Sequence, residues 1–171
     1  GRRSLTLYEG MTGMMENAFI SVKNRSFSLQ ANVEIPADGA QGVIFAQGGR
    51  FGGWALYLNQ DGCLAYTNNW VGLAVTTVSS PEPLKAGPAT LRLDFAYDGG
   101  GMGKGGNVVL SVDGRAVAEG RVDRTTSSVY SLDEGADVGM DEDTPVSESY
   151  RAGRASRFTG RINDVTIEVL D

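Results

Sequence analysis

The sequence contains no histidine and only one cysteine, Cys63, among its 171 residues. Without histidine there is no Ser-His-Asp or Cys-His nucleophilic site and no histidine-ligated zinc. A single cysteine forms no internal disulfide and no cysteine-rich metal cluster. These classes of site are therefore excluded. We interpret Cys63, which lies between a turn and an apolar run, as a small buried hydrophobic residue.

Basic residues are in the minority, with 15 Lys and Arg against 21 Asp and Glu and a net charge of −6. Binding to nucleic acid depends on neutralising phosphates, so it usually shows as a basic domain. Docking on anionic lipid needs the same kind of charge. No apolar run approaches the roughly 20 residues that a membrane-spanning helix requires. We therefore expect neither nucleic acid nor membrane among the partners.

Helical periodicity is also missing, because no window repeats apolar residues at i, i+3 and i+4 over three turns. The chain instead has 24 glycines and stretches of strict alternation, most clearly Phe27–Ile35. Residues 43–46 form a continuous apolar run, which favours a strand buried on both faces. We predict one all-β domain over residues 1–171, an antiparallel β-sandwich with little or no helix.

Three local predictions refine this picture. The final strand, over residues 162–169, is expected beside the strand that starts at Phe27, with an irregularity near Asn163. A strand over residues 73–78 is expected to end at Ser79-Ser80-Pro81. Residues 101–106 match G-x-G-x-x-G, but a strand follows them where a nucleotide-binding loop needs a helix. We therefore exclude a dinucleotide site.

Residues 91–122, taken with 131–135 and 144–147, carry a longer pattern. They closely resemble the C-terminal β-sandwich domain that follows the catalytic domain in some large bacterial-type arylsulfatases. Similar runs lie at residues 23–26, 42–54 and 81–87, and the resemblance covers roughly residues 8 to 169. It implies a concanavalin-like or laminin-G-like jelly roll, and a chain that is a C-terminal fragment of a longer arylsulfatase-like protein.

The resemblance also implies a function. The domain would be a non-catalytic accessory domain that packs against the catalytic sulfatase domain of the same chain and shapes substrate access or oligomerisation. The parent protein would use formylglycine and a divalent metal. Formylglycine forms within C/S-x-P/A-x-R, and Cys63-Leu64-Ala65-Tyr66-Thr67 fails that motif because Thr67 stands where arginine is required. We therefore expect no catalytic residue and no enzymatic activity in this chain alone.

Two alternatives come from other classes. One is an independent carbohydrate-binding module of the laminin-G or lectin kind. The other is a jelly-roll glycosidase, which needs two carboxylates facing each other across a cleft. Glu34 and Glu168 lie on polar faces of predicted strands, but nothing in the sequence pairs them. We therefore place the glycosidase behind the accessory-domain and carbohydrate-binding hypotheses.

Carboxylates are dense between residues 133 and 143, with Asp133, Glu134 and Asp137 at the start. Hard oxygen ligands of this kind suit Ca²⁺, although the spacing does not match an EF-hand. The other interpretation is a solvated acidic turn, or pairing with the arginines downstream. Calcium at this loop is therefore a hypothesis, and the domain itself requires no cofactor.

Arg151, Arg154 and Arg157 follow the acidic loop. Guanidinium groups match sulfate and carboxylate oxygens with two parallel hydrogen bonds, so these residues are candidates for binding a sulfated or carboxylated polymer. Surface arginines are also commonly solvated or paired with acids. The sequence leaves both interpretations open.

Tyr66, Asn68, Asn69 and Trp70 lie close together after a predicted turn. Sugar sites often combine an aromatic platform with amide groups that hydrogen-bond hydroxyls, so these residues are candidates for a carbohydrate site. Alternatively they cap the core of the sandwich or contact a neighbouring domain. Trp54, within an alternating strand, is predicted to be a core residue.

Overall fold

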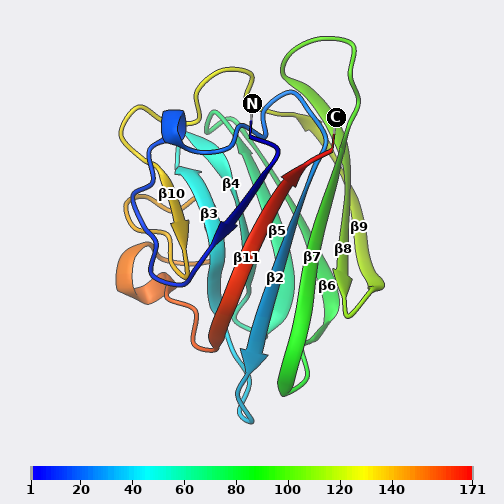
Figure 1. Cartoon of the computed structure of the whole chain (residues 1–171), viewed down its shortest axis with the longest axis vertical. Coiled ribbons are helices and arrows are strands. Elements are labelled where there is room, and N and C mark those ends of the chain that lie inside the picture. Colours follow the sequence, from blue (N-terminus) through cyan, green and yellow to red (C-terminus); the bar gives the residue numbers. More distant parts are fainter. Residues whose placement is uncertain (1, 171) are drawn as a thin grey trace.

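The computed structural model describes residues 2–170, which form a sandwich of two antiparallel sheets (Figure 1). The six-stranded sheet has the order β1-β11-β2-β7-β8-β9, and the five-stranded sheet has the order β10-β3-β4-β5-β6. The strands are β1 (Ser4–Leu7), β2 (Phe27–Ile35), β3 (Gly42–Gly49), β4 (Gly52–Leu58), β5 (Cys63–Trp70), β6 (Ala74–Pro83), β7 (Gly87–Tyr97), β8 (Lys104–Val112), β9 (Arg115–Arg124), β10 (Ala136–Val138) and β11 (Arg161–Val169). The predicted all-β class is confirmed.

The helical content of residues 2–170 is two short 3₁₀ turns, η1 (Glu16–Ala18) and η2 (Gly153–Ser156). Within the same residues, no helix has the length and apolar character needed to cross a membrane.

Strand β2 shows how alternation builds the core. Leu29, Ala31 and Val33 are buried between the sheets, while the residues between them face outward. Strand β11 pairs antiparallel with β2, with Val165 opposite Ala31. The register shifts between Ile162 and Asp164, which confirms the predicted irregularity near Asn163. The predicted neighbourhood of the final strand is confirmed as well.

An aromatic cluster fills one end of the core. The Trp54 ring lies 5.1 Å from the ring of Phe27 and 4.9 Å from that of Phe45, centroid to centroid. Its indole N–H donates to Oε1 of Gln47 at 3.1 Å, which satisfies the polar atom of this buried ring. Trp54 is therefore a core residue, as predicted.

Strands β3, β4 and β5 of the five-stranded sheet are covered on both faces. Val146, from the segment between β10 and η2, packs on the outward-facing Val43, Ala55 and Tyr57 in a second apolar cluster. This cover explains why β3 and β4 are apolar along nearly their whole length, as predicted for residues 43–46.

Two parts of the strand prediction need correction. Strand β6 continues through Ser79-Ser80-Pro81 to Pro83, where the sequence predicted an end. It lies at the edge of its sheet, so a residue that donates no backbone hydrogen bond is tolerated there. The short strands β1 and β10 were not predicted, since neither is long enough to show a period.

Cys63 is buried as expected, and burial raises the pKa of its thiol.

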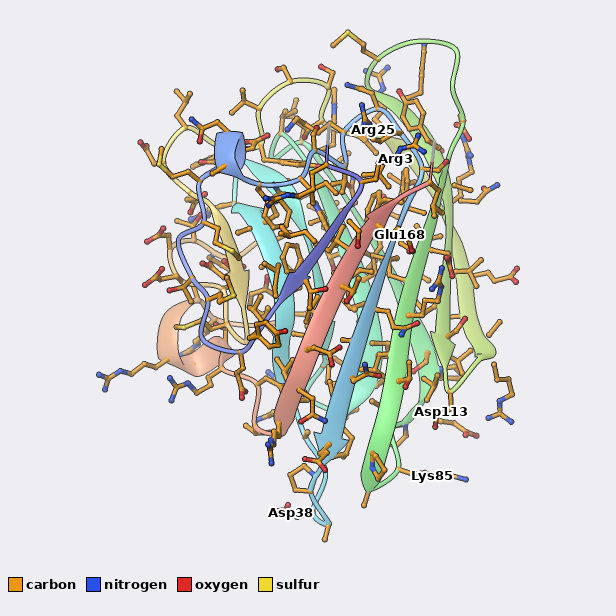
Figure 2. The ribbon with its side chains drawn as sticks, in the orientation of Figure 1. Arg3, Arg25, Asp38, Lys85, Asp113 and Glu168 are labelled. Carbon is orange, nitrogen blue, oxygen red and sulfur yellow. The ribbon has the colours of Figure 1, made fainter. Side chains whose placement is uncertain are left out.

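Charged side chains mark the two ends of the sandwich. Figure 2 shows Asp38, Lys85 and Asp113 at one end, while Arg3 and Arg25 lie towards the other. The second end also carries η1 and the loop that joins β9 to β10 (Figure 1).

Candidate functional site

A pocket of about 440 Å³ opens between η1 and the loop that joins β9 to β10. One wall comes from Gly13, residues 15–17 and Lys23, and the other comes from Ser128, Val129, residues 131–135 and Asp143. The two walls are more than a hundred residues apart in the chain. They meet because Met14 and Ala136 exchange backbone hydrogen bonds of 3.0 and 2.8 Å, which add the N-terminal segment to the edge of β10.

The N-terminal wall is fixed by the carboxylate of Glu16. One of its oxygens accepts a hydrogen bond from the ammonium of Lys23, and the other accepts the backbone N–H of Tyr130 at 3.0 Å. The Lys23 ammonium also lies 5.0 Å from the centre of the Tyr130 ring, within the range of a cation–π contact. Glu16 and Lys23 therefore tie η1 to the opposite loop.

The loop wall is fixed by Ser131 and Glu134. The Ser131 hydroxyl oxygen accepts the backbone N–H groups of Asp133 and Glu134 at 3.3 and 3.1 Å. The Glu134 carboxylate accepts both the N–H, at 2.7 Å, and the hydroxyl of Thr144. It lies against Gly49, where any side chain would overlap it. The Glu134 side chain therefore points towards Thr144 and Gly49, whereas the Asp133 side chain is exposed at the surface.

Four polar side chains of the lining have no protein partner within residues 2–170. Each is exposed, and none makes a side-chain hydrogen bond or ion pair; they are Asn17, Ser128, Asp133 and Asp143. Apolar side chains stand beside them: Leu132 is 93% exposed, Met15 66% and Val129 49%. The pocket thus presents free hydrogen-bonding groups next to an unburied apolar surface.

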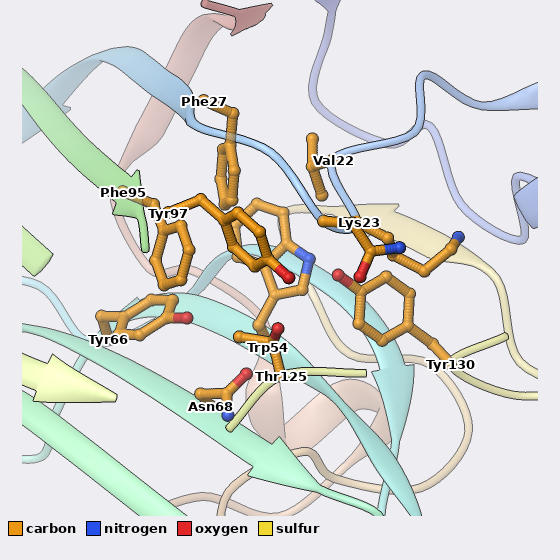
Figure 3. Close-up of a pocket in the computed structure, with 11 residues that line it drawn as sticks. Val22, Lys23, Phe27, Trp54, Tyr66, Asn68, Phe95, Tyr97, Thr125 and Tyr130 are labelled. Carbon is orange, nitrogen blue, oxygen red and sulfur yellow. The ribbon is translucent and has the colours of Figure 1, made fainter. Parts of the chain in front are cut away.

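Behind the Lys23 wall lies a second, much smaller cavity of about 10 Å³ inside the aromatic end of the core. Figure 3 shows Lys23 and Tyr130 together on one side of it, with Tyr66 and Phe95 across from them and Trp54 between. A volume of this size holds at most a single water molecule. Burial raises the pKa of both tyrosine hydroxyls. The cavity therefore belongs to the core.

The structure does not place Tyr66, Asn68, Asn69 and Trp70 on one exposed face. They are consecutive or nearly so along β5, and side chains of a strand alternate between its faces. Tyr66 and Asn68 are buried and line the small inner cavity, and the Asn68 amide donates to the Arg124 carbonyl at 3.0 Å.

Asn69 points to the covered outer face, where it donates to the carbonyls of Arg50 and Val146 at 2.9 and 3.1 Å. Trp70 is half-buried, with the Arg124 guanidinium 4.9 Å from its ring centre. The amides that were predicted to contact a sugar are thus already bonded to the backbone.

The three carboxylates predicted as calcium ligands point in different directions. Asp133 faces solvent, and Glu134 is bonded to Thr144. Asp137 is buried and accepts the N–H groups of Gly13 at 2.7 Å and Glu142 at 2.9 Å, while burial raises its pKa. Among residues 2–170 no group of three or more Cys, Asp or Glu side chains is placed to hold a metal ion. The three side chains therefore do not converge on one point, and calcium binding stays a prediction.

The three arginines do not converge either. Arg151 lines a pocket of about 260 Å³ together with Glu148 and Gln60. Arg154 lies in η2, and Arg157 follows it, where its backbone bridges to Val43. Arg154 and Arg157 are exposed and line none of the three pockets. The anion site stays a prediction for which the structure offers no assembled group.

Comparison with known proteins supports the fold. No family model and no curated protein matches the chain. Among solved structures it is similar to the CBM40 domain of the Ruminococcus gnavus IT-sialidase bound to α2,3-sialyllactose, with 14% identity, 99% of this chain and 92% of that chain covered, and a TM-score of 0.61.

It is also similar to a heptameric SAP-like pentraxin from Limulus polyphemus, with 13% identity, coverage of 99% and 78%, and a TM-score of 0.53. For the LG1–3 region of the laminin α2 chain, identity is 12%, coverage is 99% and 30%, and the TM-score is 0.52. At such low identity these likenesses show a shared architecture, a concanavalin-like β-sandwich. The concanavalin-like part of the predicted resemblance is thereby confirmed, and nothing in the comparisons supports its arylsulfatase part.

Sequence reasoning found the pocket only in part: it selected Asp133 and Glu134, as calcium candidates, but not Met15, Asn17 or Ser128. A partial signal was present: the runs at residues 23–26, 42–54 and 131–135 were singled out together. The structure brings these three runs together at the pocket. Lys23 and residues 131–135 line it, and Gly49 leaves room for the Glu134 carboxylate.

Proposed function

We propose that this chain is a non-catalytic carbohydrate-binding module and that the 440 Å³ pocket beside η1 holds the sugar. The observation that carries the proposal is the pocket itself. Its volume lies within the range of roughly 300 to 1,000 Å³ typical of small-molecule sites.

The lining matches the chemistry of a sugar ring, which has apolar C–H faces and polar hydroxyl edges. Met15, Val129 and Leu132 offer an aliphatic wall for a C–H face. Asn17 both donates and accepts hydrogen bonds, while Asp133 and Asp143 accept them from hydroxyl groups. Hydrogen bonds to a carboxylate are stronger than neutral ones, so these two residues would dominate the polar recognition.

The similar solved structures support the same class of function. One of them, the Ruminococcus gnavus CBM40 domain, was determined with bound α2,3- and α2,6-sialyllactose. Because one architecture hosts many functions, this support is secondary to the pocket.

A second candidate is the accessory domain of an arylsulfatase, which rests on the sequence resemblance. Exposed apolar side chains at the β3–β4 turn, the β5–β6 turn and the start of β6 favour it, because a catalytic domain would bury such side chains. They are Phe51, Val71, Leu73 and Val75. The intact mass of the protein from its source, together with a tryptic map, tests this candidate. A formylglycine-bearing C-x-P-x-R peptide in the same polypeptide would support it, and a mature chain without one would refute it.

The carbohydrate proposal is tested by glycan-array binding of the wild-type chain and two matched variants. Asn17→Trp fills the pocket beside η1, and Gln60→Trp makes the same change at the 260 Å³ pocket. Both side chains are exposed and without hydrogen bonds, so both variants should fold. We expect the wild type and Gln60→Trp to bind the same glycans and Asn17→Trp to lose at least tenfold in apparent affinity. Absence of binding to every glycan, or full binding by Asn17→Trp, would contradict the proposal.

A further inference from the structure

We infer that the pocket beside η1 selects glycans by charge, accepting uncharged and amino-bearing sugars and disfavouring sialylated and sulfated ones. This inference rests on the carbohydrate-binding function proposed above. It differs from the preference that the sialyllactose-bound neighbour or the candidate arginine site would suggest.

The titratable groups of the lining are unequal in sign. Glu16, Asp133, Glu134 and Asp143 stand against a single ammonium, that of Lys23, which leaves a formal excess of three negative charges. No arginine lines the pocket within residues 2–170. The net charge of −6 for the whole chain has the same sign.

The one cation of the lining is already occupied. Lys23 donates to Glu16 and lies over the Tyr130 ring, and the Lys23 side chain is only 12% exposed. A sulfate or carboxylate entering the pocket would therefore have to break this ion pair or remain without a cationic partner. An unpaired anion in a partly desolvated site is unfavourable.

The two free carboxylates of the pocket repel an anionic ligand and attract a ligand that carries hydroxyl or ammonium groups. Asp133 and Asp143 are exposed and bonded to no protein group, so they are available to hydroxyl or ammonium hydrogens. Two such charges about 6 Å from a ligand anion in water oppose its binding by about tenfold in total, and salt weakens the effect. The same charges favour an ammonium group by a comparable factor.

The experiment compares one set of oligosaccharide backbones, each immobilised in neutral, amino, sialylated and sulfated forms, at low ionic strength. The proteins are the wild type, the double variant Asp133→Asn with Asp143→Asn, and the control Asp38→Asn. Asp38 lies in the β2–β3 turn at the opposite end of the sandwich (Figure 2) and makes no side-chain bond. None of the three substitutions removes a hydrogen bond, and circular dichroism with a thermal melt verifies folding.

We expect the wild type to bind neutral and amino forms at least tenfold more tightly than their acidic counterparts. The double variant should reduce this preference to about threefold or less, while Asp38→Asn should leave it unchanged. Equal or tighter binding of acidic glycans by the wild type would overturn the charge selectivity and leave the binding function standing. A preference that survives in the double variant would overturn its assignment to this pocket. Absence of all binding would instead overturn the proposed function.

Discussion

Asp133 and Asp141 lie eight positions apart in the same acidic segment, yet their environments are opposite. Asp133 faces solvent at the pocket and makes no side-chain bond, whereas Asp141 is 1% exposed. One oxygen of Asp141 accepts the Tyr150 hydroxyl at 2.5 Å and the Val146 N–H at 3.0 Å. Asp141 can be buried because hydrogen-bond donors lie within reach of its carboxylate. Burying a carboxylate without such donors would cost too much free energy.

The comparison separates carboxylates that build the fold from carboxylates that remain available to a ligand. Asp137, Asp141 and Glu134 belong to the first group, since each accepts at least one backbone N–H. Asp133 and Asp143 belong to the second. The density of acids in the sequence does not distinguish the groups, so the calcium hypothesis for Asp133, Glu134 and Asp137 combines members of both.

The largest effect is expected from Asp141→Ala. The substitution leaves the Tyr150 hydroxyl and the Val146 N–H without their acceptor, and it releases the segment that covers the five-stranded sheet. We expect the free energy of unfolding to fall by about 2 to 4 kcal/mol. Urea denaturation measures it, and a loss below about 0.5 kcal/mol would show that Asp141 does not build the fold.

The second prediction concerns pH. Burial raises the pKa of Asp141 to about 6 from 3.8, despite the hydrogen bond from Tyr150. Between these values the folded state binds more protons than the unfolded state, so this residue makes stability fall as pH rises from about 4 to about 6. The change amounts to about 3 kcal/mol.

Asp141→Asn keeps an oxygen for both hydrogen bonds but does not titrate, so it isolates this effect. The difference in unfolding free energy between the wild type and Asp141→Asn, measured by urea denaturation from pH 4 to 7, should favour the variant increasingly as pH rises. A difference that is constant with pH would contradict the assignment.

A smaller effect is expected from Gly49→Ala. The added methyl group would occupy the space of the Glu134 carboxylate, which must then leave Thr144. We expect a loss of about 1 to 2 kcal/mol in the free energy of unfolding. In a Glu134→Ala background the same substitution should cost almost nothing, and an undiminished cost there would mean that Glu134 is not the obstacle.

The smallest effect is expected from Asp133→Asn, because no protein group depends on that carboxylate. The free energy of unfolding should change by less than about 0.5 kcal/mol. A loss as large as that of Gly49→Ala would erase the distinction between the two groups of carboxylates.

The sequence was sufficient for most of the fold, because burial between two sheets imposes a period of two on β2, β7 and β11. It was sufficient even for β3, whose run of apolar residues reflects its covered outer face. It was insufficient for β1 and β10, which are too short to be periodic. Strand β6 was predicted to end early because the tolerance of an edge strand for Pro81 depends on its place in the sheet.

The candidate site was predicted only in part, for two physical reasons. The pocket joins residues 13–23 to residues 128–143 through loops that have no period. The alternative at β5 was chosen from composition, although Tyr66 and Asn69 must point to opposite faces of a strand. Alternation separates Asn69 from the other three residues, and burial between the sheets removes Tyr66 and Asn68 from the surface.

Glycan-array binding of the wild type, Asn17→Trp and Gln60→Trp tests most directly whether the pocket beside η1 is a carbohydrate site. We expect the wild type and Gln60→Trp to bind the same glycans and Asn17→Trp to lose at least tenfold in apparent affinity. Absence of binding to every glycan, or full binding by Asn17→Trp, would contradict the central claim.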